Sequence, residues 1–421
     1  MPNRPRARPS ARRSPILVLV VGLAGIGLVA GCGTVTPTRP SATIGPPSSS
    51  SASGSPAEEP SPSVPTASAT PTVSAGPGIA WRSVAVPGVS ATMARIAIGP
   101  DRIVVAVDSG TADGGPSGQV AFWSSADTVS WVVASNVPAG DDGIVTAIAA
   151  VGDGFVAVGT DGTASQPRTW ASADGRRWSV SATIGLGAVG ATAAAMTSVA
   201  VGLDGTIVAG GFADVPAQRL AIAWTSRDGG STWRSSVVDG SGSRAQVQGV
   251  ARGGPGWVAT GIRDAGASFW LSRDGRVWVH VVPQPPVGGT LGAESSADGV
   301  ACTTVRCVAV GQGPSAGDGW AWWSRVPEVW NTVPHADAFP GGASRAVVAS
   351  DATFVAGGAG SDGRFGIWTS TDGHRWTASP QVAGPAGVVV DLAADGSRIV
   401  AVGPAAGAAT GFTVWIGAAS R

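Results

Sequence analysis

The sequence predicts an all-β fold: a seven-bladed β-propeller of four-stranded antiparallel blades, preceded by a segment that does not fold. Two tryptophan series and a Val-Ala motif predict it, because all three recur together from residue 78 to the C-terminus. The first series has Ser or Gly two residues after each Trp and comprises Trp123, Trp170, Trp224, Trp270, Trp322, Trp368 and Trp415. The second series follows eight or nine residues later and comprises Trp131, Trp178, Trp233, Trp278, Trp330 and Trp376. A repeat of roughly 48 residues made of short strands is typical of propeller blades.

Composition excludes several functions. Of 421 residues, 63 are Gly, 31 are Pro and 17 are Trp, whereas Tyr and Lys are absent, so all 27 basic residues are Arg against 27 acids. A net charge of zero argues against a polyanion binder, and no nucleic-acid partner is expected. The apolar share of 43% argues against a wholly disordered chain. Neither Tyr nor Lys can serve as a catalytic side chain.

Residues 1–31 have the pattern of an export signal. Five arginines and no acid precede an apolar run over residues 16–30, which is too short for a comfortable membrane span. Val29-Ala30-Gly31-Cys32 resembles the lipobox of bacterial lipoproteins, and that resemblance implies cleavage before Cys32 and acylation of its thiol, for example with palmitate. An ordinary signal peptide with an incidental cysteine is the alternative, and both Sec and twin-arginine export stay open.

Residues 32–77 are expected to form a disordered tether. The segment is mostly Ser, Thr, Pro, Ala and Gly, has no aromatic residue, and carries only Arg39, Glu58 and Glu59 as charges. Such a segment cannot bury a core. It would hold the folded domain, residues 78–421, roughly 35–40 Å from the lipid.

Within each repeat the pattern indicates strands. Apolar runs rich in Val, Ile and Trp alternate with Gly, Asp and Pro clusters, without a helical period. In the fourth copy we expect strands near residues 246–251, 256–260, 268–272 and 277–282. The last copy has only three strands, and residues 79–84 have the pattern of a fourth. Trp81 lies 27 residues before Asp108, as Trp376 does before Gly403. The N-terminal strand should therefore complete the seventh blade and close the ring.

A Ser-x-Asp motif lies between the two tryptophans of most copies. Its aspartates are Asp127, Asp174, Asp228, Asp274 and Asp372, and Val326 replaces the Asp in the copy that begins at Ser324. Asp and the Gly that usually follows it suit a tight turn between the third and fourth strands, because Asp caps its own backbone and Gly takes a positive φ. We assign these aspartates a structural role.

These motifs resemble the Asp-box (BNR) repeat of sialidase-like β-propellers, over essentially the whole folded part. For a sialidase, the resemblance implies a Tyr nucleophile with a Glu partner, an Arg triad and an Asp acid/base. This chain has no Tyr, and Glu294 and Glu328 are the only Glu residues of the folded part. The sialidase mechanism is therefore disfavoured and no catalytic residue is assigned, although a hydrolase with two Asp carboxylates stays open.

Loop lengths predict which end of the propeller binds. The turns between the third and fourth strands are uniform, whereas the loops between the second and third strands vary, and variable loops on one face often mark the binding face. Each of six such loops carries a carboxylate, and these form the candidate binding rim: Asp113, Asp161, Asp214, Asp264, Asp318 and Asp362. The alternative is that these residues only make surface turns. Trp257, Trp320 and Trp323 lie outside both series and are the first candidates for stacking on a sugar.

Cys302 and Cys307 should form a disulfide, because four residues separate them at a predicted turn and the compartment is oxidising. No metal site is expected, since His280, His335 and His374 are isolated, and no cofactor motif appears.

The sequence therefore predicts a monomeric module on the extracytoplasmic face of the cell membrane, held by a lipid anchor and binding a protein or glycan. A sialidase-like glycoside hydrolase with non-standard catalytic residues, or an assembly factor for a membrane complex, are the alternatives.

Overall fold

The structure is a computed structural model that describes residues 79–87, 91–110, 116–134, 143–180, 184–254, 256–285, 295–313, 319–333, 338–379, 387–405 and 411–418. The expected export signal and tether, with Cys32, lie outside the described residues, as do Asp113 and Asp318 of the rim. Within these ranges, no helix is long and apolar enough to cross a bilayer.

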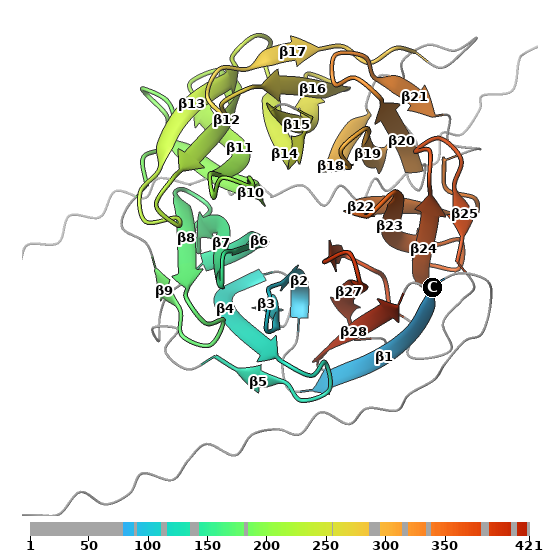
Figure 1. Cartoon of the computed structure of the whole chain (residues 1–421). Coiled ribbons are helices and arrows are strands. Elements are labelled where there is room, and N and C mark those ends of the chain that lie inside the picture. The colour runs from blue at the N-terminus through green and yellow to red at the C-terminus, as the bar shows by residue number, and fades with distance from the viewer. Residues whose placement is uncertain are drawn as a thin grey trace, which may run out of the picture. The chain divides into compact units, whose positions relative to one another are not determined.

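Seven sheets of four antiparallel strands stand around a central axis (Figure 1). We number the blades 1 to 7 and name their strands a to d from the axis outward. Blade 1 contains β2 (Ala91–Ile98), β3 (Ile103–Gly110), β4 (Pro116–Ser125) and β5 (Val132–Val133). Blade 2 contains β6 (Gly143–Val151), β7 (Gly154–Asp161), β8 (Pro167–Ser172) and β9 (Ser179–Val180). Blade 3 contains β10 (Ala193–Val201), β11 (Ile207–Val215), β12 (Gln218–Ser226) and β13 (Arg234–Asp239).

The next three blades repeat this order. Blade 4 contains β14 (Ala245–Gly253), β15 (Gly256–Arg263), β16 (Gly266–Ser272) and β17 (Val279–Val281), close to the strands expected for that copy. Blade 5 contains β18 (Ser296–Cys302), β19 (Cys307–Gln312), β20 (Gly319–Ser324) and β21 (Asn331–Val333). Blade 6 contains β22 (Gly342–Ser350), β23 (Thr353–Gly360), β24 (Phe365–Ser370) and β25 (Thr377–Ala378).

Blade 7 joins the two ends of the folded chain, as the tryptophan spacing predicts. It contains β26 (Asp391–Ala394), β27 (Arg398–Pro404), β28 (Gly411–Ala418) and, as strand d, β1 (Ala80–Pro87). Strands β1 and β28 pair antiparallel over their whole length, from Ala80 opposite Ala418 to Pro87 opposite Gly411 (Figure 1). The first strand of the fold therefore closes the ring.

The two tryptophan series pack neighbouring blades together. Every Trp of the first series is buried on a strand c, and two of the second series stack on the blade before them. Trp178 of blade 2 stacks on Phe122 of blade 1 with ring centroids 3.7 Å apart, and Trp330 of blade 5 stacks on Phe269 of blade 4 at 4.4 Å. Because one twisted sheet cannot bury both faces alone, these aromatic contacts hold the ring together.

The glycine that ends the recurring Val-Ala motif is required by a close backbone approach. In blades 2 to 6, strand a carries a β-bulge directly after the residue that faces this glycine. At Gly159, an added Cβ would overlap the carbonyl oxygen of Ile144. Asp108 stands at this position in blade 1, where the bulge precedes the facing residue Met93 instead. The motif is thus a signature of the bulged a–b pair.

Candidate functional site

A hollow of about 730 Å³ opens at the end of the propeller that carries the a–b and c–d turns. We call this end the turn face and the opposite end, with the b–c and d–a loops, the loop face. The lining of the turn-face hollow comes from four consecutive blades, 3 to 6, and consists of Val201, Leu203, Arg252, Gly254, Cys302, Thr303, Thr304, Val305, Arg306, Ala349, Asp351, Ala352, Phe354 and Thr371. Strand a is the innermost strand of each blade (Figure 1). Most of the lining residues lie at the a–b turns, which places the hollow near the propeller axis.

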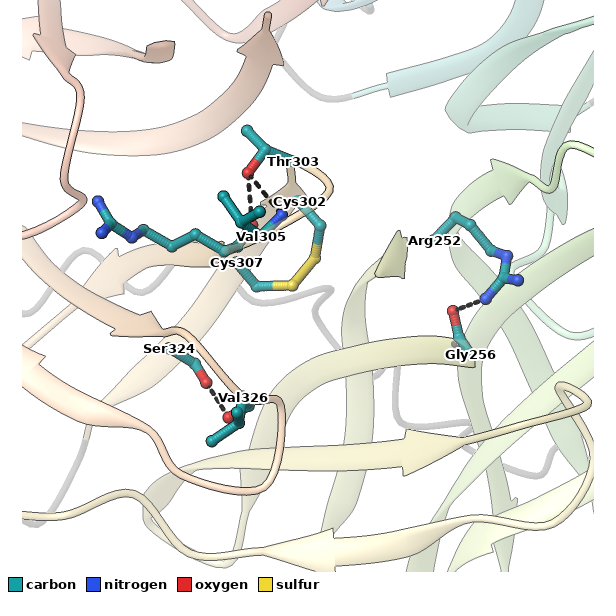
Figure 2. Close-up of a disulfide and its surroundings, with 9 residues drawn as sticks. Arg252, Gly256, Cys302, Thr303, Val305, Cys307, Ser324 and Val326 are labelled. Carbon is teal, nitrogen blue, oxygen red and sulfur yellow. Dashed lines mark hydrogen bonds between the residues drawn. A yellow bond between two sulfur atoms is a disulfide. The ribbon is translucent and has the colours of Figure 1, made fainter. Parts of the chain in front are cut away.

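One wall of the hollow is a disulfide-closed turn (Figure 2). Cys302 and Cys307 face each other as the last pair of β18 and β19, with their sulfurs bonded, so the structure contains the disulfide that the sequence predicts. The backbone N–H of Thr303 donates to the carbonyl oxygen of Arg306 at 2.8 Å and tightens the turn. Gly253, at the end of β14, packs against the bridge: an added Cβ would lie 2.5 Å from the Cys302 sulfur.

Two arginines from neighbouring blades bring positive charge to the hollow. Arg252 donates to the carbonyl oxygen of Gly256, and Figure 2 shows it across from the disulfide-closed turn. Arg306 donates to the carbonyl oxygen of Thr371 at 3.0 Å. Among the described residues, neither guanidinium has a carboxylate within 4.0 Å, and Asp351 is the one acid of the lining. The lining therefore carries one more positive charge than negative.

Asp204 also affects the charge around the hollow, although it is not part of the lining. Its turn connects β10 and β11, next to Leu203 of the hollow. The Thr206 hydroxyl and backbone N–H donate to its carboxylate and lower its pKa, and the Arg252 charge contributes to the same shift. Asp204 stays ionised but forms no ion pair with Arg252, because the two groups are separated by more than 4.0 Å.

On the loop face, the four described carboxylates of the predicted rim form hydrogen bonds within or next to their own turns. Asp161 accepts the backbone N–H of Ser165 at 2.7 Å and its hydroxyl at 2.8 Å. Burial raises the pKa of Asp161, but these hydrogen bonds outweigh it and the net pKa is lowered. Asp214 forms a bidentate ion pair with Arg219, with N–O distances of 2.6 and 2.9 Å.

The remaining described rim residues behave similarly. Asp264 accepts the backbone N–H of Ser243 at 2.9 Å, which is the largest cause of its lowered pKa and joins the d–a connection to the b–c turn of blade 4. Asp362 accepts the backbone N–H of Arg364 at 3.0 Å. Such contacts are typical of Asp residues that stabilise surface turns, which is the alternative given above for the rim. Ligand binding by the rim stays a prediction, and the hollow lies on the opposite face.

The Ser-x-Asp motifs form hydrogen-bonded turns at the turn face. In blade 2, Asp174 accepts the backbone N–H groups of Arg176 at 2.8 Å and Arg177 at 2.9 Å, and these bonds lower its pKa. The other motif aspartates accept amides in the same way and also have lowered pKa values: Asp127, Asp228, Asp274 and Asp372. Ionised carboxylates that cap a turn are stabilisers of the backbone and not acid/base groups at neutral pH.

The three tryptophans outside the series differ in access. Trp257 is buried, so it cannot stack on a ligand. Trp320 is partly buried and lies 6.2 Å from Trp322, ring to ring. Trp323 is partly buried between Arg306 and His374, whose ring centroid is 5.5 Å away. Trp323 is thus linked to the hollow through Arg306.

Two buried carboxylates near the axis were not anticipated from the sequence. Asp298 accepts the Ser296 hydroxyl at 2.7 Å and the Gln312 side-chain amide at 3.1 Å, yet burial dominates and raises its pKa. Burial likewise raises the pKa of Asp391, which accepts the Ile96 backbone N–H at 2.9 Å across the interface of blades 7 and 1. Asp298 is the bulged residue of strand a in blade 5. Aligning the repeats on the glycine that faces each bulge could have drawn attention to it.

Chemical possibilities at these sites are restricted. Within the described ranges, no three His, Cys, Asp or Glu side chains are close enough together to hold a metal ion. The hollow offers a single carboxylate, two guanidinium groups, three threonine hydroxyls and exposed aliphatic side chains. Most glycoside hydrolases use two carboxylates that flank the scissile bond. The lining offers one carboxylate and does not supply that pair, whereas its guanidinium and hydroxyl groups can bind a ligand.

Comparison with known proteins identifies a fold without a family. No family model matches the chain, and no curated protein matches its sequence. Among solved structures, YCF48 bound to a D1 peptide has a TM-score of 0.51 and 12% identity, covering 83% of this chain and 98% of that one. A GH74 xyloglucanase from Xanthomonas campestris has a TM-score of 0.50 and 18% identity, covering 78% of this chain and 52% of that one. A Trypanosoma rangeli sialidase has a TM-score of 0.47 and 11% identity, covering 80% and 54%. At these identities the similarity establishes the β-propeller fold alone.

Proposed function

We propose that this protein is a lipid-anchored, extracytoplasmic β-propeller that binds a partner protein through the turn-face hollow. The observation that carries the proposal is the lining of that hollow, where guanidinium groups without an ion-pair partner in the described part of the chain stand beside exposed aliphatic side chains. Leu203 is fully exposed and Val305 is 73% exposed, both at tips of a–b turns. Exposed apolar groups with a charged surround are typical of interaction surfaces.

The anchor rests on the sequence of the export signal. The basic segment, the short apolar run and the lipobox-like residues before Cys32 together support acylation at that cysteine. The Ser-x-Asp turns support kinship with the Asp-box propellers. The absence of Tyr and the scarcity of Glu disfavour the sialidase mechanism in this chain. A similar propeller is described as bound to a D1 peptide, which supports protein binding as a use of this fold. Scaffolding and assembly of a membrane complex are both forms of such binding.

Affinity capture with matched variants tests the proposal. The full-length lipidated protein should recover a partner from solubilised membranes, and Leu203→Glu together with Val305→Glu should abolish recovery. Val279→Glu is the control, because Val279 is also an exposed aliphatic residue but lies on β17, outside the hollow. Recovery that survives the hollow variant would contradict the proposal. So would hydrolysis of a fluorogenic glycoside that is lost in Asp351→Asn. Cys32→Ser should release the protein from the membrane fraction.

A further inference from the structure

We propose that the turn-face hollow recognises an acidic, aliphatic protein segment. Carboxylates of the segment pair with Arg252 on one side of the hollow and with Arg306 on the other, and a neighbouring aliphatic side chain packs against Leu203 and Val305. This inference deepens the proposed function and rests on it, since it names the chemistry of the partner segment that the hollow takes.

The guanidinium groups of Arg252 and Arg306 have N–H donors that form no hydrogen bond with the described residues. A guanidinium carries five N–H donors, whereas Arg252 and Arg306 each make one hydrogen bond, to a backbone carbonyl oxygen. Those bonds fix the direction of each side chain without neutralising its charge. Arg252 also lies over Trp257, with the guanidinium carbon 5.7 Å from the ring centroid, which restricts it further. Pre-positioned guanidinium groups are the preferred partners of carboxylates.

The charge of the hollow contrasts with that of the rest of the propeller. Residues 78–421 contain 21 arginines and 25 acids, so the folded part is negative as a whole. The lining has two arginines against Asp351. Asp204, which the Arg252 charge influences at longer range, adds a negative edge beside Leu203. Acidic groups are therefore attracted to the two guanidinium groups, neither of which has an ion-pair partner among the described residues.

The aliphatic side chains favour a protein segment over a small anion or a sugar. Leu203 and Val305 lie on the a–b turns of blades 3 and 5, and Arg252 is the last residue but one of strand a in the blade between them. Covering them contributes about 25 cal/mol per Å² of apolar area removed from water. An inorganic anion leaves that surface exposed. Sugar recognition commonly uses an open aromatic face, and no Trp, Tyr or Phe of the lining is exposed in the described residues, because Phe354 is buried.

The disulfide fixes the position of half of this site. Cys302 and Cys307 close the turn that carries Thr303, Val305 and Arg306. A closed turn loses less conformational entropy when a ligand binds, so the bridge should strengthen binding without contacting the segment's carboxylate. Replacing both cysteines with serine should weaken affinity less than removing the arginines does.

A random octapeptide library tests the inference. Peptides are N-acetylated and C-amidated, so that side chains supply every carboxylate, and the full-length protein in detergent is the bait. We expect enrichment of Asp or Glu next to Leu, Ile or Val. Changing the acid of an enriched peptide to its amide, or making Arg252→Gln with Arg306→Gln, should weaken the Kd by roughly 10-fold to 100-fold, the value of a charge-assisted hydrogen-bond pair. Arg273→Gln is the matched control, since Arg273 is exposed on the same face outside the hollow.

Each other outcome overturns the inference in a recognisable way. Enriched peptides that bind without their acid, or equally to the double arginine variant, refute the acidic segment while protein binding through the hollow stands. A sulfated glycan that binds through Arg252 and Arg306 when no peptide does assigns the hollow to glycans instead. If the wild-type protein enriches no peptide and also captures no partner, the inference and the proposed function both fail.

Discussion

Replacing Trp81 with alanine should destabilise the propeller more than most single substitutions do. Trp81 lies on the closing strand β1, is 2% exposed, and meets Phe365 of blade 6 edge to face at 5.7 Å. Its core cluster includes Trp415 and Ile367, so it joins blade 7 to blade 6. Removing a buried Trp costs about 3–5 kcal/mol. With a urea m-value of about 3 kcal/mol/M, the unfolding midpoint should fall by roughly 1–2 M.

Urea unfolding followed by tryptophan fluorescence measures this loss. Trp81→Phe should retain most of the stability, because it keeps an aromatic ring against Phe365. Ala80→Ser, at an exposed position one residue earlier, should leave the midpoint unchanged. A loss below about 1 kcal/mol for Trp81→Ala would refute the reasoning, since it would mean that the closing strand contributes little to holding the ring.

Three further predictions concern single interactions. The pKa of Asp228 is lowered to about 2, chiefly by the Thr232 hydroxyl. The stability that the ionised Asp228 contributes should therefore be present above about pH 4 and lost as the pH falls toward 2. In Asp228→Asn, the free energy of unfolding should vary less with pH over that range. Asp239→Ala should cost about 1–3 kcal/mol in urea unfolding, because the buried indole N–H of Trp270, now 3.0 Å from that carboxylate, loses its acceptor. Gly253→Ala should cost a similar amount by overpacking the disulfide, and serines in place of both cysteines should relieve it in a double-mutant cycle.

Most of the fold could be predicted because the signal is local and repeated. Each blade has a buried Trp on strand c, and six of the seven have a tight c–d turn, so similar residues recur at nearly the same spacing along the chain. The ring closure could also be predicted, since Trp81 precedes Asp108 of blade 1 by the same number of residues as Trp376 precedes Gly403. The disulfide followed from two cysteines at one turn.

The hollow could not be predicted because no repeated motif encodes it. Leu203 and Val305 occupy turns of different blades and Arg252 lies near the end of a strand of a third blade, and each would be an ordinary surface residue in isolation. Uniform turn lengths suggested a purely structural face, but uniform length says nothing about which side chains face one another across the axis. Asp298 escaped notice for the same reason: its raised pKa comes from burial in the folded propeller, which no motif around it encodes.

Site-specific photocrosslinking in intact cells tests the central claim most directly. A photoreactive amino acid replaces Val305 in the hollow or, for comparison, the exposed Thr163 on the loop face of the full-length protein. Our account predicts a discrete protein adduct at Val305 that disappears when Arg252 and Arg306 are changed to glutamine, and none at Thr163. An adduct at Thr163 alone would move the binding site to the rim, and no adduct at Val305 would contradict protein binding through the hollow.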